Sequence, residues 1–233
     1  MKKRCFFLIV MVTAVMMMFV SCTDFFSTSW ASWAARDPDK LVPAVTAGNV
    51  DELIAMAENN PDLSLAILKK IQAAAANAPD GDKQKLQGAA LEAAINAGGL
   101  GQAILGAADK LTNIDTDIDG RKLVLDALNS MKNLDDSCLI LSSILPDPSD
   151  TEAFDAFAAS ANTNDLVLAA ALLMAGEAKQ YTDPEDYVEN VFDNKSPQSQ
   201  NEILAVKMIE AVVARPDELS GSLENVLKGL NLI

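Results

Sequence analysis

The most informative absence in this sequence is histidine, which does not occur at all. Without an imidazole the chain cannot build Ser-His-Asp or Cys-His catalytic groups, the histidine ligands common at zinc sites or a charge switch near neutral pH. A Walker-type phosphate loop is absent as well. Aspartate and glutamate are the only acid–base groups left for an enzyme, so we expect a non-enzymatic protein.

Cysteine is nearly as scarce, with three residues. Cys5 and Cys22 lie close to the start of the chain, so Cys138 has no disulfide partner in the remainder. It begins the apolar stretch Cys138–Leu141, and a thiol with apolar neighbours is usually buried and inert. We expect Cys138 to be a core residue.

Strand signals are also nearly missing. Aromatic residues make up 5% of the chain, and alternating β-branched runs between turns do not occur. Alanine, a strong helix former, is abundant instead. The sequence therefore predicts an all-α fold of about ten helices in stacked antiparallel hairpins. Both an irregular bundle and a degenerate solenoid of the tetratricopeptide kind fit, since no register of about 34 residues preserves the repeat pattern.

Basic residues are few, with 18 Lys and Arg against 33 Asp and Glu and a formal net charge of -15. Nucleic acids and anionic lipid surfaces need clustered Lys and Arg, so binding to either by charge is excluded. A strongly acidic protein favours cationic partners. Half of the residues are hydrophobic, which excludes a disordered acidic tail.

The N-terminus has the parts of an export signal. Lys2, Lys3 and Arg4 precede the uncharged apolar run Cys5–Val20. As a helix this run reaches about 25 Å, which is short of the ~30 Å hydrocarbon core of a membrane. The length favours a removable signal peptide over a permanent transmembrane anchor.

The end of this run, Phe19-Val20-Ser21-Cys22, resembles the lipobox of bacterial lipoproteins in the relaxed form found in spirochaetes. It departs from the commonest pattern, which has Leu three positions before the cysteine and Gly or Ala directly before it. The resemblance implies that Cys22 is the lipid-bearing first residue of the mature protein. Acyl chains on Cys22 would hold the domain on a bacterial membrane, facing the periplasm or the cell surface.

Three regions follow from this interpretation: a signal peptide over 1–21, a lipidated tether over 22–45 and an acidic helical domain over 46–233. The tether carries four of the chain's aromatic residues: Phe25, Phe26, Trp30 and Trp33. Tryptophan is favoured at the membrane interface, so these side chains rest there or fold back onto the domain. The sequence does not decide between the two.

Hydrophobic spacing and helix-stop residues divide the domain into helices. An amphipathic stripe with i, i+3, i+4, i+7 spacing marks the first: Val50, Leu53, Ile54 and Ala57. Asn60-Pro61-Asp62 is expected to separate it from the next, with Asp as the cap. Further helices are expected over Leu63–Ala78, Lys83–Ala97, Gln102–Leu111, Val124–Met131, Asp136–Leu145, a segment to Ser160 capped by Ser149 or Asp150, Leu166–Lys179, a short one at Asp183, one from Ser196-Pro197 to Ala214, and a last one after Arg215.

Two of these segments have a more specific interpretation. The run Leu166–Met174 is apolar on every side, which predicts a helix at the centre of the core that opens at Asn164 or Asp165. Gly98-Gly99-Leu100-Gly101 has glycines like a dinucleotide-binding loop, but it follows a helix and its spacing is wrong. We expect a turn between two helices there.

One motif has the pattern of a metal site. Asp115, Asp117 and Asp119 are followed by Gly120, and Asp126 stands at the twelfth position, as in a calcium loop. A lysine at the eighth position, where an apolar residue is usual, and Asp in place of Glu at the twelfth count against calcium. The alternative is an acidic loop that caps the helix beginning near Gly120.

The sequence thus predicts a membrane-anchored, non-enzymatic envelope lipoprotein that serves as a helical adaptor or binding module for a protein partner. A carrier of a ligand for an envelope transporter is the alternative, and a deep apolar pocket would favour it. A calcium-dependent structural protein is a third possibility, and an enzyme is the least favoured. Neither the ligand, the partner nor the oligomeric state follows from the sequence.

Overall fold

The computed structural model describes residues 38–103, 126–180, 187 and 199–219. The chain divides into two compact units, Met1–Leu41 and Val42–Ile233. In the first, the described part holds α3 (Pro38–Leu41). The second begins four residues before the predicted domain boundary, because Val42 and Val45 are buried in its core. No helix in the described ranges has the length and apolar content needed to span a membrane.

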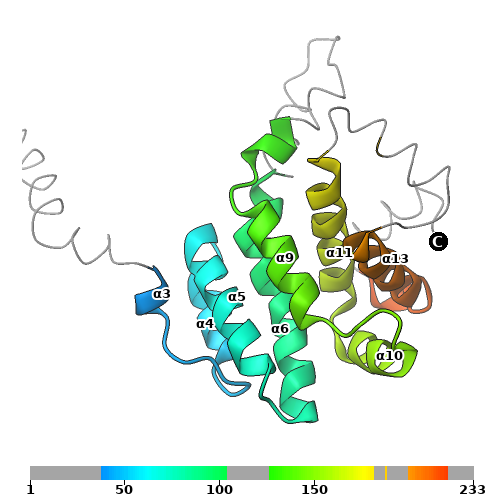
Figure 1. Ribbon diagram of the computed structural model, residues 1–233, viewed down its shortest axis with the longest axis horizontal. Coiled ribbons are helices and arrows are strands. Elements are labelled where there is room, and N and C mark those ends of the chain that lie inside the picture. Colours follow the sequence, from blue (N-terminus) through cyan, green and yellow to red (C-terminus); the bar gives the residue numbers. More distant parts are fainter. Residues whose placement is uncertain (1–37, 104–125, 181–186, 188–198, 220–233) are drawn as a thin grey trace, which may run out of the picture. The chain divides into compact units, whose positions relative to one another are not determined.

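The second unit confirms the all-α prediction, and its described residues contain no strand. Its helices, labelled in Figure 1, are α4 (Val50–Ala57), α5 (Pro61–Ala75), α6 (Asp80–Gly98), α9 (Leu134–Ile144), α10 (Thr151–Ser160), α11 (Thr163–Ala178) and α13 (Gln200–Val213), followed by the 3-10 turn η2 (Pro216–Glu218). Residues 100–103 and 126–130 are also helical. The predicted helices at Asp183 and beyond Leu219, and most of Gln102–Leu111, lie outside the described residues.

Helix starts follow local chemistry, with two corrections to the predicted caps. Before α5, the side chain of Asn60 accepts a hydrogen bond from Leu63 N, so Asn60 is the cap and Asp62 lies in the first turn. The start predicted for α11 was wrong by three residues. Asn162 caps this helix by accepting from the backbone N–H groups of Asn164 and Asp165. Several adjacent residues were suitable caps, and the residue with extended backbone became the cap.

Two other predicted helix starts were wrong, since α13 begins at Gln200 rather than at Ser196-Pro197 and α6 begins at Asp80 rather than at Lys83. Asp150, one of the two predicted alternatives, caps α10 by accepting from Ala153 N at 3.1 Å. Ser199 and Glu202 form a reciprocal capping box at the start of α13. The predicted glycine turn is confirmed, because Gly99 ends α6 in the left-handed conformation with φ 72°.

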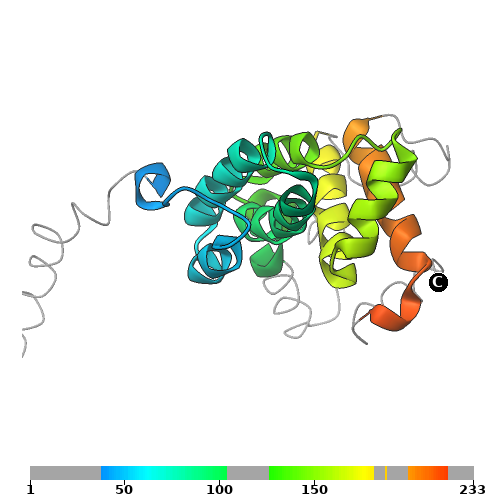
Figure 2. The ribbon, with the colours of Figure 1, turned by 90° about the horizontal axis from the view of Figure 1, so that it is seen from below.

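The helices of the second unit form a two-layered stack. In the chain order α4, α5, α6, α9, α11, α13, each helix packs against the next and against the next but one. One layer contains α4, α6 and α11, and the other contains α5, α9 and α13. Figure 2 looks nearly along the axes of α5 and α6 and shows this alternation. Contacts mainly between neighbours are typical of solenoids, so the arrangement favours a degenerate solenoid over an irregular bundle.

Helix α10 departs from this order. It packs against α6 and α13, which are not neighbours in the stack. Figure 1 shows α10 nearly end-on, whereas α5 and α6 run in the plane of that view; Figure 2 shows the opposite. Helix α10 therefore crosses the direction of the stack at the end where α6 begins.

The core confirms most of what the apolar run predicted. In α11, six residues of Leu166–Met174 are buried: Leu166, Val167, Ala169, Ala170, Leu172 and Leu173. Ala171 is exposed, so one side of this helix faces solvent. Helix α11 packs against α6, α9 and α13, which places it within the core and places α6 in contact with more of the other helices.

Two glycines let helix axes approach closely. A Cβ on Gly98 of α6 would lie 2.5 Å from Leu172 Cδ1, and one on Gly176 of α11 would lie 2.6 Å from Cys138 Sγ. Distances below 3.0 Å do not occur between real Cβ atoms and their neighbours. These two crossings therefore depend on the missing side chain.

Candidate functional site

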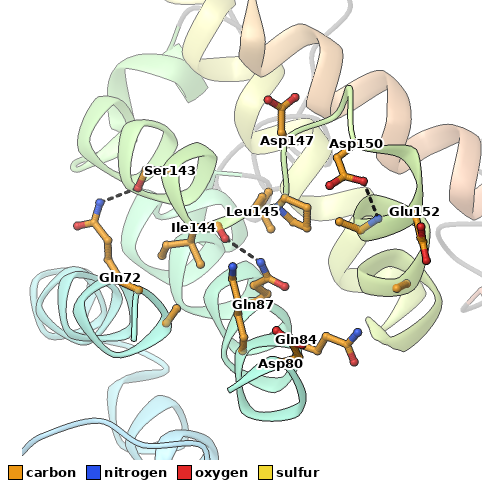
Figure 3. Close-up of a pocket in the computed structure, with 16 residues that line it drawn as sticks. Gln72, Asp80, Gln84, Gln87, Ser143, Ile144, Leu145, Asp147, Asp150 and Glu152 are labelled. Carbon is orange, nitrogen blue, oxygen red and sulfur yellow. Dashed lines mark hydrogen bonds between the residues drawn. The ribbon is translucent and has the colours of Figure 1, made fainter. Parts of the chain in front are cut away.

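A cleft of about 810 Å³ in the second unit is drawn in Figure 3. It lies where α5 and α9 end and where α6 and α10 begin. We call it the amide cleft, after the glutamines Gln72, Gln84 and Gln87 in its lining. The other lining residues are Ala75, Ala76, Asp80, Lys83, Ser143, Ile144, Leu145, Pro146, Asp147, Asp150, Glu152, Ala153 and Ala156.

Two of the glutamines are held in place. Gln87, with 3% of its surface exposed, donates from Nε2 to the carbonyl of Ile144 at 2.9 Å. Gln72 donates to Ser143 Oγ at 2.6 Å, and that hydroxyl donates to the carbonyl of Ile140 (Figure 3). A buried amide that is satisfied in this way has a fixed orientation, so its group is preorganised for a ligand.

Carboxylates surround the cleft. Asp80, Asp147, Asp150 and Glu152 line it together with a single cation, Lys83. Two of these carboxylates also have local roles, since Asp150 caps α10 and Asp147 accepts from Ser149 N at 2.8 Å and Ser149 Oγ at 2.6 Å. The hydrogen bonds from the hydroxyl and the amide of Ser149 lower the pKa of Asp147 below its ordinary value.

The lining of the amide cleft offers hydrogen-bonding groups and negative charge. The cleft lining contains neither a cysteine nor an aromatic ring, and its one hydroxyl, on Ser143, already donates to a carbonyl. Nucleophilic catalysis needs a nucleophile beside a base. Amides donate and accept hydrogen bonds, and carboxylates accept them from cations. The arrangement therefore fits a ligand with polar main-chain groups and positive charge.

A second hollow of about 400 Å³ lies between α4, α6 and the start of α11. We call it the acidic groove, after its carboxylates Asp51, Glu92 and Asp165. Its cation, Lys85, is paired with Asp51 at 2.9 Å. Burial, and then the charges of Asp165, Glu58 and Asp51, raise the pKa of Glu92, and burial raises the pKa of Asp165. The close approach of these carboxylates in the acidic groove therefore lowers the stability of the fold when they are ionised.

The third hollow, of about 630 Å³, lies beside Cys138 between α9, the end of α11 and the start of α13. The thiol is buried and donates to the carbonyl of Leu172 at 3.4 Å. Burial, more than the nearby charges of Asp135 and Glu177, raises its pKa to about 12. The prediction that Cys138 is buried is confirmed, and its low reactivity stays a prediction.

Most residues of the predicted calcium loop lie outside the described residues, namely Asp115, Asp117 and Asp119. Asp126 is described, exposed, and begins the helical stretch 126–130. Among the residues with defined positions, no group of three His, Cys, Asp or Glu could hold a metal ion. Calcium binding at this loop stays a prediction. Cys22 and the aromatic residues of the tether also lie outside the described ranges.

None of the three hollows described above is the deep apolar pocket expected of a ligand carrier. Each of them opens to solvent and has carboxylates in its lining. The carrier hypothesis therefore has no observation in its favour here and stays a prediction.

The sequence did not identify the glutamines of the amide cleft. Gln84 and Gln87 stand in the polar first half of α6, where such residues are common on solvated helix faces. They share a hollow only because the ends of α5 and α9 and the start of α10 meet α6 there, and Gln87 is buried with its side chain bonded to Ile144 of α9. The spacing of three residues between them was a weak signal, because it occurs on any helix face.

Comparison of the chain with models of protein families, with curated proteins and with solved structures finds no match.

Proposed function

We propose that this protein is a lipid-anchored, non-enzymatic adaptor of the bacterial cell envelope that binds a basic segment of a partner protein in the amide cleft. The lipobox resemblance at Cys22 supports the anchor, and the stack of helical hairpins supports an adaptor, since such stacks offer extended binding surfaces. The charge of -15 supports a cationic partner.

One observation carries the choice of ligand, namely the lining of the amide cleft. Orientated glutamine side chains can pair with both the N–H and the C=O of a peptide backbone. Four carboxylates against one lysine favour lysine or arginine side chains in that peptide. The absence of aromatic rings from this lining disfavours a sugar or a nucleobase, which proteins commonly hold by stacking on such rings.

Binding in the cleft can be measured with a fluorescein-labelled Lys-Ala-Lys tripeptide and the full chain in detergent. We expect saturable binding that weakens several-fold in Glu152→Gln, because one cleft carboxylate is lost. Asp136→Asn is the matched control, since Asp136 also stands in the first turn of a helix but outside the cleft. Equal affinities in both variants, or no binding at all, would contradict the proposal.

The anchor is tested by the intact mass of protein extracted from bacterial membranes after labelling with palmitate. We expect a mass that begins at Cys22 and includes acyl chains, and loss of both the label and membrane retention in Cys22→Ser. An unmodified mass that retains residues 1–21 would contradict the anchor. A specific hydrolytic or transfer activity of the purified protein would contradict the non-enzymatic assignment.

A further inference from the structure

The amide cleft and the acidic groove meet at one side chain. Gln84 lines both hollows. On α6, Asp80 and Gln87 face the cleft, whereas Gly88 and Glu92 face the groove. The two hollows therefore flank the first half of α6 and adjoin at Gln84.

Helix α10 connects the same two hollows from the opposite side. Its first turns, with Glu152, line the cleft, and its last residue, Ser160, lines the groove. Its ten residues are about 15 Å long as an α-helix. An extended peptide advances about 3.3 Å per residue, so about five residues reach from one hollow to the other.

Charge is complementary to a basic segment at both ends of this path. The two hollows together have seven carboxylates and two lysines in their linings. Lys85 is already paired with Asp51, so the positive charge near the groove is occupied. Burial is the main cause of the raised pKa of Glu92, and repulsion by neighbouring carboxylates is the second. A cation beside Glu92 and Asp165 would offset that repulsion.

Gly88 leaves the acidic groove open, although the packing of the fold does not require a glycine at this position. It lies in the interior of α6, where glycine is less favourable than alanine. A Cβ at this position would meet nothing within 4 Å. Packing therefore does not require glycine at 88, in contrast to Gly98, and a larger side chain there would project into the groove.

Resting on the proposed function, we propose that the partner segment does not end in the amide cleft. It is an extended peptide of about five residues that passes Gln84 along the seam between α6 and α10, with one basic side chain in the cleft and a second in the acidic groove. The two hollows are thus one binding site for two spaced positive charges.

The test compares the Lys-Ala-Lys tripeptide with the hexapeptide Lys-Ala-Ala-Ala-Ala-Lys, whose lysines are about 17 Å apart when extended. Both peptides carry fluorescein, and their affinities for the full chain are read from anisotropy. We expect the hexapeptide to bind on the order of tenfold more tightly, because only it reaches both hollows.

Two variants separate the groove from the cleft. Gly88→Leu fills the groove, and the pair Glu92→Gln with Asp165→Asn removes its charge without adding bulk. Each is expected to remove the advantage of the hexapeptide and to leave the affinity of the tripeptide unchanged. Gly101→Leu is the matched control, since a Cβ there also meets nothing within 4 Å and Gly101 lines neither hollow. Circular dichroism checks that each variant is folded.

The outcomes distinguish this inference from the proposed function. If both peptides bind equally well, or the hexapeptide keeps its advantage in the charge variant, the extension into the groove is wrong and binding in the cleft stands. If neither peptide binds the unaltered chain, the proposed function fails as well. Loss of the advantage in the charge variant alone supports the inference even where Gly88→Leu does not fold.

Discussion

At the scale of single residues, two glycines of α6 have opposite packing environments. Gly98 lies 2.5 Å, at its virtual Cβ, from Leu172 Cδ1, and Leu172 is fully buried. Gly88 has open space around the same position. Chemically identical residues ten positions apart on one helix thus have different packing roles, which no sequence pattern distinguishes.

This contrast makes the first prediction. Gly98→Ala should lower the free energy of unfolding by about 1–3 kcal/mol, because Leu172 must move in a close-packed core. Gly88→Ala should raise it by about 0.5–1 kcal/mol through helix propensity. Urea denaturation followed by circular dichroism measures both. A destabilised Gly88→Ala, or an unaffected Gly98→Ala, would contradict the packing described at these two positions.

The second prediction concerns Cys138. Because burial raises its pKa to about 12, the folded protein holds the thiol protonated, and its contribution to stability is full below pH 9 and is lost as the pH rises towards 12. In a chain with Cys5→Ser and Cys22→Ser, a thiol reagent at pH 8 should react with Cys138 only after urea unfolds the domain. Rapid labelling of the native protein would show that the thiol is accessible.

At the scale of helices, caps decide where elements begin. The sequence left Ser149 and Asp150 as alternatives for α10, and the structure selects Asp150, whose side chain accepts from Ala153 N. Ser149 instead donates to Asp147 on the surface. The two neighbours therefore differ in what they contribute to the helix.

The third prediction follows from that difference. Asp150→Ala should lower the free energy of unfolding by about 1 kcal/mol, the usual effect of losing an N-cap. Ser149→Ala should change it by a few tenths, because its hydrogen bond is exposed. Thermal unfolding of the two variants, measured in parallel, provides the test. An equal change in stability in both would contradict the assignment of Asp150 as the cap.

Helices with amphipathic spacing were predictable, as the stripe of Val50, Leu53, Ile54 and Ala57 in α4 demonstrates. The start of α11 was not, because Asn162, Asn164 and Asp165 are all good caps and their backbone conformations come from tertiary packing. The crossing direction of α10 was equally beyond the sequence. Its buried Phe154 and Phe157 show which face is covered but not by which helix.

At the scale of the whole molecule, negative charge opposes folding. The pKa of Glu92 is raised in the folded state, so its contribution to stability is full at low pH and is lost as the pH rises through that pKa. Glu92 is exposed by surface area although its carboxyl is partly desolvated, so solvent screens its interactions. At neutral pH the ionised Glu92 therefore destabilises the fold weakly, through partial burial and through repulsion by Asp165, Glu58 and Asp51.

The fourth prediction tests this account. Glu92→Gln should raise the urea midpoint at pH 7, and the gain should fade near pH 4, where protonation already neutralises Glu92. Added salt should stabilise the unaltered protein more than the variant, since screening weakens the same repulsion. Glu52→Gln, an exposed change in the first turn of α4, controls for the loss of one charge. A variant that is less stable at pH 7 would contradict the account.

The all-α class and the stacked hairpins followed from helix spacing and stop residues, because both depend on local sequence. The amide cleft did not follow, because it is made by residues from α5, α6, α9 and α10 that are brought together only by packing. The lack of histidine excludes imidazole chemistry, yet an exclusion does not indicate which surface is used.

Helix α10 also limits where further helical hairpins can be inserted into this stack. A stack of hairpins lengthens by duplication, because a new hairpin needs only its two neighbours. Since α10 contacts both α6 and α13, a hairpin inserted between them would separate its two supports by about another helix diameter of 10 Å. The ten-residue α10 would then lose one contact. Duplications are therefore expected to be tolerated before α4 but not within the part that α10 crosses.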